Sequence, residues 1–140
     1  MMTQVDFYHH VANPSLFACR LAQTVYRRGE SLLIFLEDEA ARTQFDEQLW
    51  TFQAGSFVPH CRAEAPIAAQ TPILLSCVPL ESPPRVVLNL TAEPLPNPAH
   101  YTRILEIIGQ DPDALARART VARTYKAQGF DITYHDMAQH

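Results

Sequence analysis

Three short, continuous runs of apolar residues constrain the fold of this chain more than any other feature of its sequence. They occupy residues 32–36 (LLIFL), 73–78 (ILLSCV) and 86–90 (VVLNL). Their length, and the lack of regular alternation with polar residues, favour strands that are covered on both faces. Strands of this kind are typical of parallel sheets flanked by helices. The runs therefore predict the central strands of a layered α/β fold.

Helices are predicted around these runs because residues that start helices stand at the right places. Asn13-Pro14 and Asp111-Pro112 each combine an N-cap side chain with proline at the first helical position. The acids of Glu37-Asp38-Glu39 would oppose the positive end of a helix dipole, so this cluster needs no catalytic explanation. The other expected elements are a strand at 4–8, helices at 13–28, 37–50, 98–108 and 111–128, a loop at 51–70 and a closing strand at 130–134.

Strands that alternate with helices predict a three-layer α/β/α fold, Rossmann-like, with a mostly parallel sheet. The length of 140 residues suits a single domain, 1–140, without internal repeats or a linker. No stretch reaches the roughly 18 consecutive apolar residues of a membrane span. The N-terminal segment also lacks the basic start and the long apolar run of a signal peptide. We therefore expect a cytoplasmic protein that does not bind membranes.

The sequence motifs of several enzyme classes are missing. Its four glycines cannot form GxGxxG or a phosphate loop, and no GxSxG elbow occurs. Cys19, Cys61 and Cys77 are widely spaced and form no CxxC pair, so they are interpreted as buried, reduced thiols. His9-His10 is a weak metal site because adjacent side chains of a strand point to opposite faces. We expect no catalytic residue, no cofactor and no metal.

Positive charge is concentrated in one predicted helix, although the formal net charge of the chain is −4. Residues 114–128 contain four cations and no acid. At about 100° per residue, Arg119, Arg123 and Lys126 share a stripe that faces solvent. The core face is expected to contain Ala114, Ala118, Val121 and Tyr125, with Leu115 and Ala122 between the two. Like-charge repulsion is not relieved by acids at i±4, so an anionic partner is one explanation, and an ordinary solvated face is the other.

A second candidate surface contains aromatic residues. Trp50, the only tryptophan, stands where a predicted helix gives way to a loop, and Phe52 and Phe57 follow it. Tryptophan is a frequent anchor of protein interfaces, which favours a docking surface. Packing against the edge of the core is the alternative interpretation.

These two regions resemble the chi subunit family of bacterial DNA polymerase III, and the resemblance covers almost the full chain. The matching segments are Phe7-Tyr8, Glu37-Asp38-Glu39, Asp46-Glu47-Gln48-Leu49-Trp50, Ser56-Phe57-Val58-Pro59-His60, and Arg119, Arg123 and Tyr125-Lys126 leading to Gly129-Phe130. The resemblance implies a Rossmann-like α/β/α fold without nucleotide chemistry. It also implies a non-catalytic adaptor of the replicative polymerase holoenzyme, which meets DNA only indirectly.

Two partners are implied by the same resemblance. The acidic C-terminal tail of single-stranded-DNA-binding protein, which ends in a hydrophobic residue, would bind the basic helix at Arg119, Arg123 and Lys126. The psi subunit, which tethers chi to the clamp loader, would bind at Trp50 and Phe57. Helicase-like repair proteins are a further class of partner for that second surface.

The chain departs from the family pattern at Leu115 and Ala122, where relatives can carry a lysine and a tyrosine. This departure favours a tail pocket that is shallower or less charged, and therefore weaker binding of the tail.

Two other functions are compatible with the sequence. One is a small enzyme with a divergent nucleotide site near His9-His10 and Glu37-Asp38. The other is direct binding of single-stranded DNA, with Tyr125 and Tyr134 as stacking platforms for bases. The negative net charge argues against the second, since sequence-independent binding of DNA needs a broad cationic surface.

Overall fold

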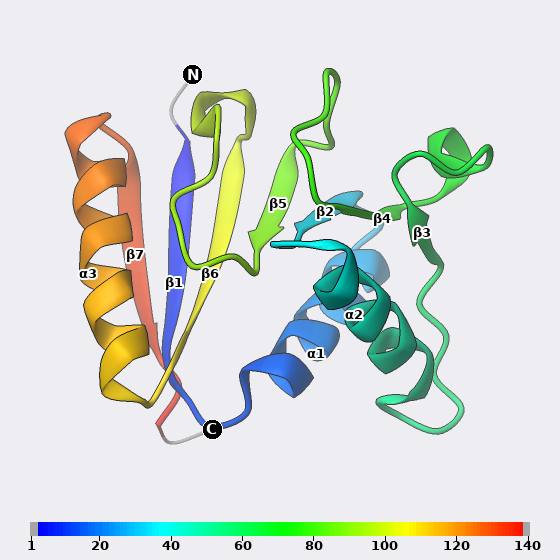
Figure 1. Ribbon diagram of the computed structural model, residues 1–140, viewed down its shortest axis with the longest axis horizontal. Helices are drawn as coiled ribbons and strands as arrows, with labels where there is room; N and C mark the ends of the chain where they lie inside the picture. The colour runs from blue at the N-terminus through cyan, green and yellow to red at the C-terminus, as the bar shows by residue number, and fades with distance from the viewer. Residues whose placement is uncertain (1–2, 139–140) are drawn as a thin grey trace.

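A seven-stranded sheet forms the centre of the computed structural model, which describes residues 3–138 (Figure 1). Its strand order is β3-β4-β2-β5-β6-β1-β7, and every neighbouring pair is parallel. The strands are β1 (Gln4–Val11), β2 (Leu32–Phe35), β3 (His60–Arg62), β4 (Ile73–Ser76), β5 (Val86–Asn89), β6 (Arg103–Gly109) and β7 (Asp131–Asp136). The α-helices are α1 (Pro14–Arg27), α2 (Glu39–Thr51) and α3 (Pro112–Ala127), and two 3-10 turns are η1 (Ala68–Gln70) and η2 (Pro98–His100).

Two hydrophobic cores lie on opposite faces of the sheet. Along β2, Leu32 and Ile34 belong to the core under α1 and α2, whereas Leu33 and Phe35 belong to the core under α3. Successive residues of a strand point to opposite faces, so a strand buried on both faces needs apolar residues at every position. This explains the continuous apolar runs and confirms the predicted three-layer α/β/α fold with a parallel sheet.

The predicted helix starts are confirmed by their capping bonds. The side chains of Asn13, Asp38 and Asp111 each accept a hydrogen bond from the backbone N–H three residues later, at 3.2, 2.8 and 2.8 Å. The predicted strands at both ends of the chain are present as β1 and β7. Within residues 3–138, no helix has the length and apolar character that crossing a bilayer requires.

The prediction of a helix at 98–108 is wrong. Only the short turn η2 forms there, and β6 follows it and pairs with both β5 and β1. Glu106 made this run look less apolar than the other central strands. The structure buries Glu106 with hydrogen bonds, and the three isoleucines of the run, which are β-branched, favour a strand.

The prediction of a loop at 51–70 is wrong in part. Residues His60–Arg62 form β3 at the edge of the sheet, paired with β4, and η1 follows. A strand of three residues is too short to produce a periodic pattern in the sequence.

Candidate functional site

The basic residues of α3 form an exposed cationic face, which we define as Arg119, Arg123 and Lys126. All three side chains lie at the surface, and within the described residues no ion pair joins them to an acid. Their spacing of four and then three residues places them on one side of the helix. Arg117 is also exposed, but it lies on another side of α3 beside the cavity described below. Within the described residues, no acidic side chain therefore neutralises the positive charge of this face.

The apolar side of α3 is the one that the sequence predicted. Val121 and Tyr125 are buried in the core, and Ala114 and Ala118 are partly buried. Ala122, which was expected between the core face and the cations, is buried in this core, and Leu115 is partly buried against it. Leu115 therefore lies at the border of the packed side of the helix.

A buried polar network anchors α3 to the sheet. Tyr125 is fully buried, and its hydroxyl donates to Glu106 Oε2 at 2.7 Å and accepts from the backbone N–H of Leu95 at 3.1 Å. Asn89 Nδ2 donates to the same carboxyl oxygen at 2.9 Å. Burial raises the pKa of Glu106 to about 8, so this carboxyl is mostly neutral at pH 7. Sequence reasoning missed Glu106, and its signal was a lone acid within an otherwise apolar strand.

The burial of Tyr125 also corrects a prediction about DNA. A base cannot stack on a ring that has no exposed surface, so Tyr125 is not a stacking platform. Tyr134 is half-exposed on the edge strand β7 and stacks on Phe7 with ring centroids 5.5 Å apart.

Two aromatic side chains define the second surface, which we call the aromatic surface: Trp50 and Phe57. Trp50 comes from the last turn of α2 and Phe57 from the segment before β3, and their ring centroids are 5.6 Å apart. They are 51% and 61% exposed, so the two rings cover each other and not the core. Phe52 instead packs against the core under α1 and α2. Core packing therefore explains Phe52 but neither of the exposed rings.

A buried histidine supports the aromatic surface. The His60 ring lies 4.6 Å from the Trp50 ring, centroid to centroid, and its Nδ1 donates to the carbonyl of Val58 at 2.6 Å. The other ring nitrogen, Nε2, is 3.1 Å from Asp46 Oδ1, without the alignment of a hydrogen bond. The loop between the two rings is also fixed, because the Gln23 side chain donates to the Ser56 hydroxyl.

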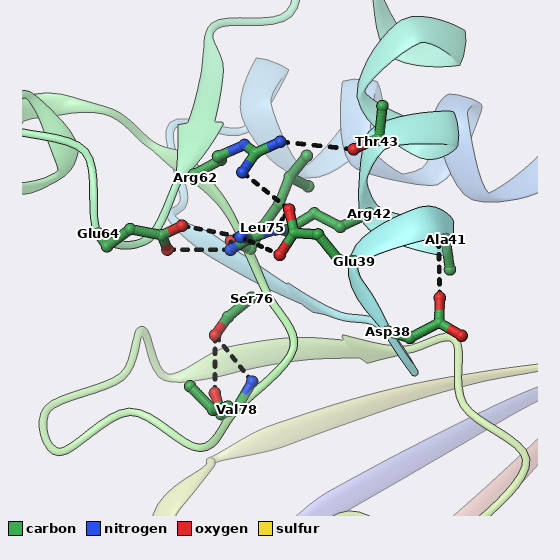
Figure 2. Close-up of polar contacts among 10 residues, drawn as sticks. All are labelled: Asp38, Glu39, Ala41, Arg42, Thr43, Arg62, Glu64, Leu75, Ser76 and Val78. Carbon is green, nitrogen blue, oxygen red and sulfur yellow. Dashed lines mark hydrogen bonds and ion pairs between the residues drawn. The ribbon is translucent and has the colours of Figure 1, made fainter.

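A buried arginine joins the start of α2 to the sheet (Figure 2). Arg42 lies 2.6 Å from Glu39 Oε2 and 2.8 Å from Glu64 Oε1, and Glu39 also pairs with Arg62 at 2.7 Å. The hydrogen bond from Arg42 lowers the pKa of Glu64. These contacts connect α2 with β3 and the segment after it. Glu39 therefore forms ion pairs in addition to lying in the first turn of α2, where an acid opposes the positive end of the helix dipole.

A cavity of ≈ 320 Å³ lies where several strands end, a common place for ligands in open α/β sheets. Glu37, Glu106 and Arg117 are among its lining residues, and Gly109 is the only glycine among them. Asp38, which the nucleotide hypothesis placed beside Glu37, caps α2 instead. The cavity therefore has no phosphate-binding glycine loop. Of the residues that the nucleotide hypothesis names, which are His9-His10 and Glu37-Asp38, only Glu37 lines it.

The three cysteines are free thiols. Cys19 is buried, as predicted, and burial raises the pKa of its thiol to about 11. Cys61 and Cys77 are only partly buried, so the prediction of buried thiols is wrong for these two.

Known proteins resemble this chain in sequence and in fold. The profile of the family described as "DNA polymerase III chi subunit, HolC" matches residues 2–133. The DNA polymerase III subunit chi of Pseudomonas aeruginosa is 34% identical over 142 residues, covering 96% of each chain. That of Haemophilus influenzae is 29% identical and covers 95% of this chain and 96% of its own. Among solved structures, S. cerevisiae Dbp5 bound to RNA and ADP BeF3 has a TM-score of 0.62 at 9% identity. The match covers 96% of this chain and 41% of that one, a likeness of fold alone.

Proposed function

The chain belongs to the DNA polymerase III chi subunit family, and from this membership we propose that it is an adaptor whose two exposed surfaces bind two different proteins at once. As a chi subunit it is a non-catalytic accessory subunit of DNA polymerase III. The aromatic surface would bind the psi subunit, and the cationic face would bind the acidic C-terminal tail of single-stranded-DNA-binding protein. A helicase-like repair protein is a second occupant for the aromatic surface. We place this activity in the bacterial cytoplasm.

The position of the two surfaces is the observation that carries this proposal. The cationic face lies on α3, which packs on β6 and β7 at one end of the sheet (Figure 1). The aromatic surface lies at the end of α2, which packs on the opposite face near β4. Two partners of ordinary size can therefore bind without competing for space, which is what a tether requires.

The cationic face suits a peptide that is acidic and ends in an apolar side chain. Arg119 and Arg123 can each hold a carboxylate with two parallel hydrogen bonds, which Lys126 cannot. An exposed ion pair contributes only ~0.2–1 kcal/mol, so three of them fall short of the roughly 8 kcal/mol of micromolar binding. Burial of the terminal side chain would add ~1.5–3 kcal/mol, and the partly buried Leu115 provides apolar surface beside the cations.

The aromatic surface suits a partner with an apolar side chain to insert. Trp50 and Phe57 expose about half of their area or more, and the Trp50 ring already lies against the buried His60 ring. Large aromatic residues that are exposed alone and buried in a complex often dominate the energy of binding. The interaction with psi should therefore depend mainly on apolar contact.

A ternary binding experiment tests the proposal. A fluorescent peptide with the acidic tail sequence is titrated with the chain alone and with the chain already bound to psi, and fluorescence anisotropy reports the binding. We expect the same dissociation constant in both titrations and a higher plateau with psi, because the complex tumbles more slowly. Displacement of the peptide by psi would contradict two separate surfaces. A peptide with its acids replaced by amides is the control.

A further inference from the structure

The strand β1 does not run straight to its end. Its register with β6 shifts between Tyr8 and Val11, and His10 has a φ of 61°, in the left-handed region. Residues other than glycine seldom adopt this conformation, although histidine is one of those that tolerate it. The irregularity breaks the alternation of side chains, and the rings of His9 and His10 come within 4.5 Å of each other, centroid to centroid. The prediction that the two rings point to opposite faces is therefore wrong.

A carboxylate from the neighbouring strand completes the group. Asp136, at the end of β7, pairs with His9 in the strand register, and its Oδ1 lies 2.9 Å from His10 Nδ1. Possible ligand atoms of the three side chains all lie within 4.8 Å of one another. The backbone N–H of Ala138 donates to Asp136 at 3.0 Å and fixes its orientation. No hydrogen bond joins the His9 ring to another residue within 3–138, so that ring is available.

We propose that His9, His10 and Asp136 bind a divalent transition metal, with zinc as the best fit. Two imidazoles and one carboxylate are a usual three-ligand set for zinc, and water takes the fourth position. Magnesium and calcium prefer oxygen ligands only, so the donor set disfavours them. Zinc–ligand bonds of about 2.0–2.1 Å place tetrahedral ligand atoms about 3.3 Å apart, so the His10–Asp136 pair at 2.9 Å must open slightly and the more distant ligand atoms must approach. The side chains of His10 and Asp136 are 46% and 58% exposed, which leaves them free to do so.

The bound metal would have a definite structural effect. It would join the end of β1 to β7, which has a sheet neighbour on one side only. The earlier expectation of no metal rested on the alternation of strand side chains, and the irregularity at His10 removes that reason. The site is independent of the two protein-binding surfaces, because none of its three residues belongs to them.

Zinc titration of the untagged chain tests this proposal. A chromogenic zinc indicator competes for the metal, and cobalt substitution reports the coordination by its visible spectrum. We expect one equivalent to bind to the wild type, and His9→Ala, His10→Asn and Asp136→Asn each to weaken binding at least tenfold. Asparagine is chosen at position 10 because it accepts the left-handed conformation. His100→Ala, which removes an exposed histidine from η2, is the matched control and should bind zinc like the wild type.

Thiols are the competing source of zinc affinity. The titrations are therefore repeated with Cys61→Ser and Cys77→Ser in every variant, and circular dichroism confirms that each one is folded. Binding that survives the serine changes and disappears in the three site variants supports the proposal. Binding that disappears with the thiols, or that stays unchanged in the three site variants, overturns it.

Discussion

The helices that carry the cationic face and part of the aromatic surface are each anchored by a buried polar group, and the two groups are of opposite kind. Under α3, Glu106 is mostly neutral at pH 7 because burial raises its pKa to about 8. At the start of α2, the buried Arg42 is ionised between Glu39 and Glu64, whose carboxylates remain largely exposed. The helix that carries the exposed cations is thus anchored by a neutral network, whereas the start of α2, whose last turn carries Trp50, is anchored by an ionised one.

This difference gives the two anchors opposite responses to pH. The pKa of Glu106 is raised on folding, so its contribution to stability is complete below its ordinary value of 4.5 and is lost as pH rises towards about 8. The pKa of Glu64 is lowered by Arg42, so its contribution is present above 4.5 and is lost as pH falls below that value. Alkaline pH should therefore weaken the buried network of Glu106 that anchors α3. Acidic pH should weaken the ion pair between Glu64 and Arg42 that anchors α2.

Glu106→Gln should have the largest effect. The amide oxygen can still accept hydrogen bonds from Tyr125 and Asn89, but the side chain no longer loses a proton. A shift of pKa from 4.5 to about 8 corresponds to roughly 4–5 kcal/mol, which is the upper limit of the stability regained at pH 8 or above. Urea unfolding between pH 5 and 9 measures it. The exposed Glu81→Gln is the control, and an unchanged pH slope in Glu106→Gln would contradict the neutral network.

Trp50→Ala should come next, with a loss of roughly 2–4 kcal/mol in psi binding and no change in tail binding. The reason is that an exposed aromatic anchor would be removed while α3 stays intact. Calorimetry with purified psi measures the loss. Ile67→Ala is the matched control, because Ile67 is an equally exposed apolar residue outside the aromatic surface. If both variants bind psi equally well, the aromatic surface is not the psi site.

Arg119→Ala should weaken binding of the tail peptide several-fold, which corresponds to about 1 kcal/mol for an exposed charged contact. Arg117→Ala removes the same charge from another side of the same helix, so it separates local contact from a change in net charge. Calorimetry with the tail peptide compares the two. Equal losses would mean that the peptide senses only the overall charge of α3.

Ionic strength should have the smallest effect on binding, and this effect should differ between the tail and psi. Raising salt from about 0.1 M to about 1 M shortens the Debye length from about 10 Å to about 3 Å. Binding of the tail should weaken because its contacts are exposed charges, whereas psi binding should change little. Parallel salt titrations by anisotropy measure both slopes. Equal slopes would remove the distinction between a charged and an apolar surface.

Sequence reasoning recovered those parts of the fold that depend on local pattern. The strand β2 was evident because both of its faces are buried, and α3 because Asp111 and Pro112 mark its start. The strand β6 was missed because Glu106 interrupts its apolar run, and only contacts with Asn89 and Tyr125, which are distant in sequence, explain its burial.

The candidate sites were predictable to a lesser degree. Helical periodicity placed Arg119 and Arg123 at the surface, since both lie within one regular element. It could not separate Trp50, which is exposed, from Phe52, which packs on the core, because the helix ends between them. The left-handed conformation of His10 leaves no trace in composition or periodicity, so the convergence of His9 with Asp136 needed coordinates.

The position of β1 between β6 and β7 has a consequence for biosynthesis. During synthesis β1 has no sheet neighbour until residues 103–109 have been made, and its second neighbour follows at residues 131–136. Contacts between such distant segments slow folding, because a long loop must close before they form. The half of the molecule that carries α3 therefore begins to assemble only after β6 has been made, and a chain stalled before that point would leave the apolar residues of β1 exposed to chaperones and proteases.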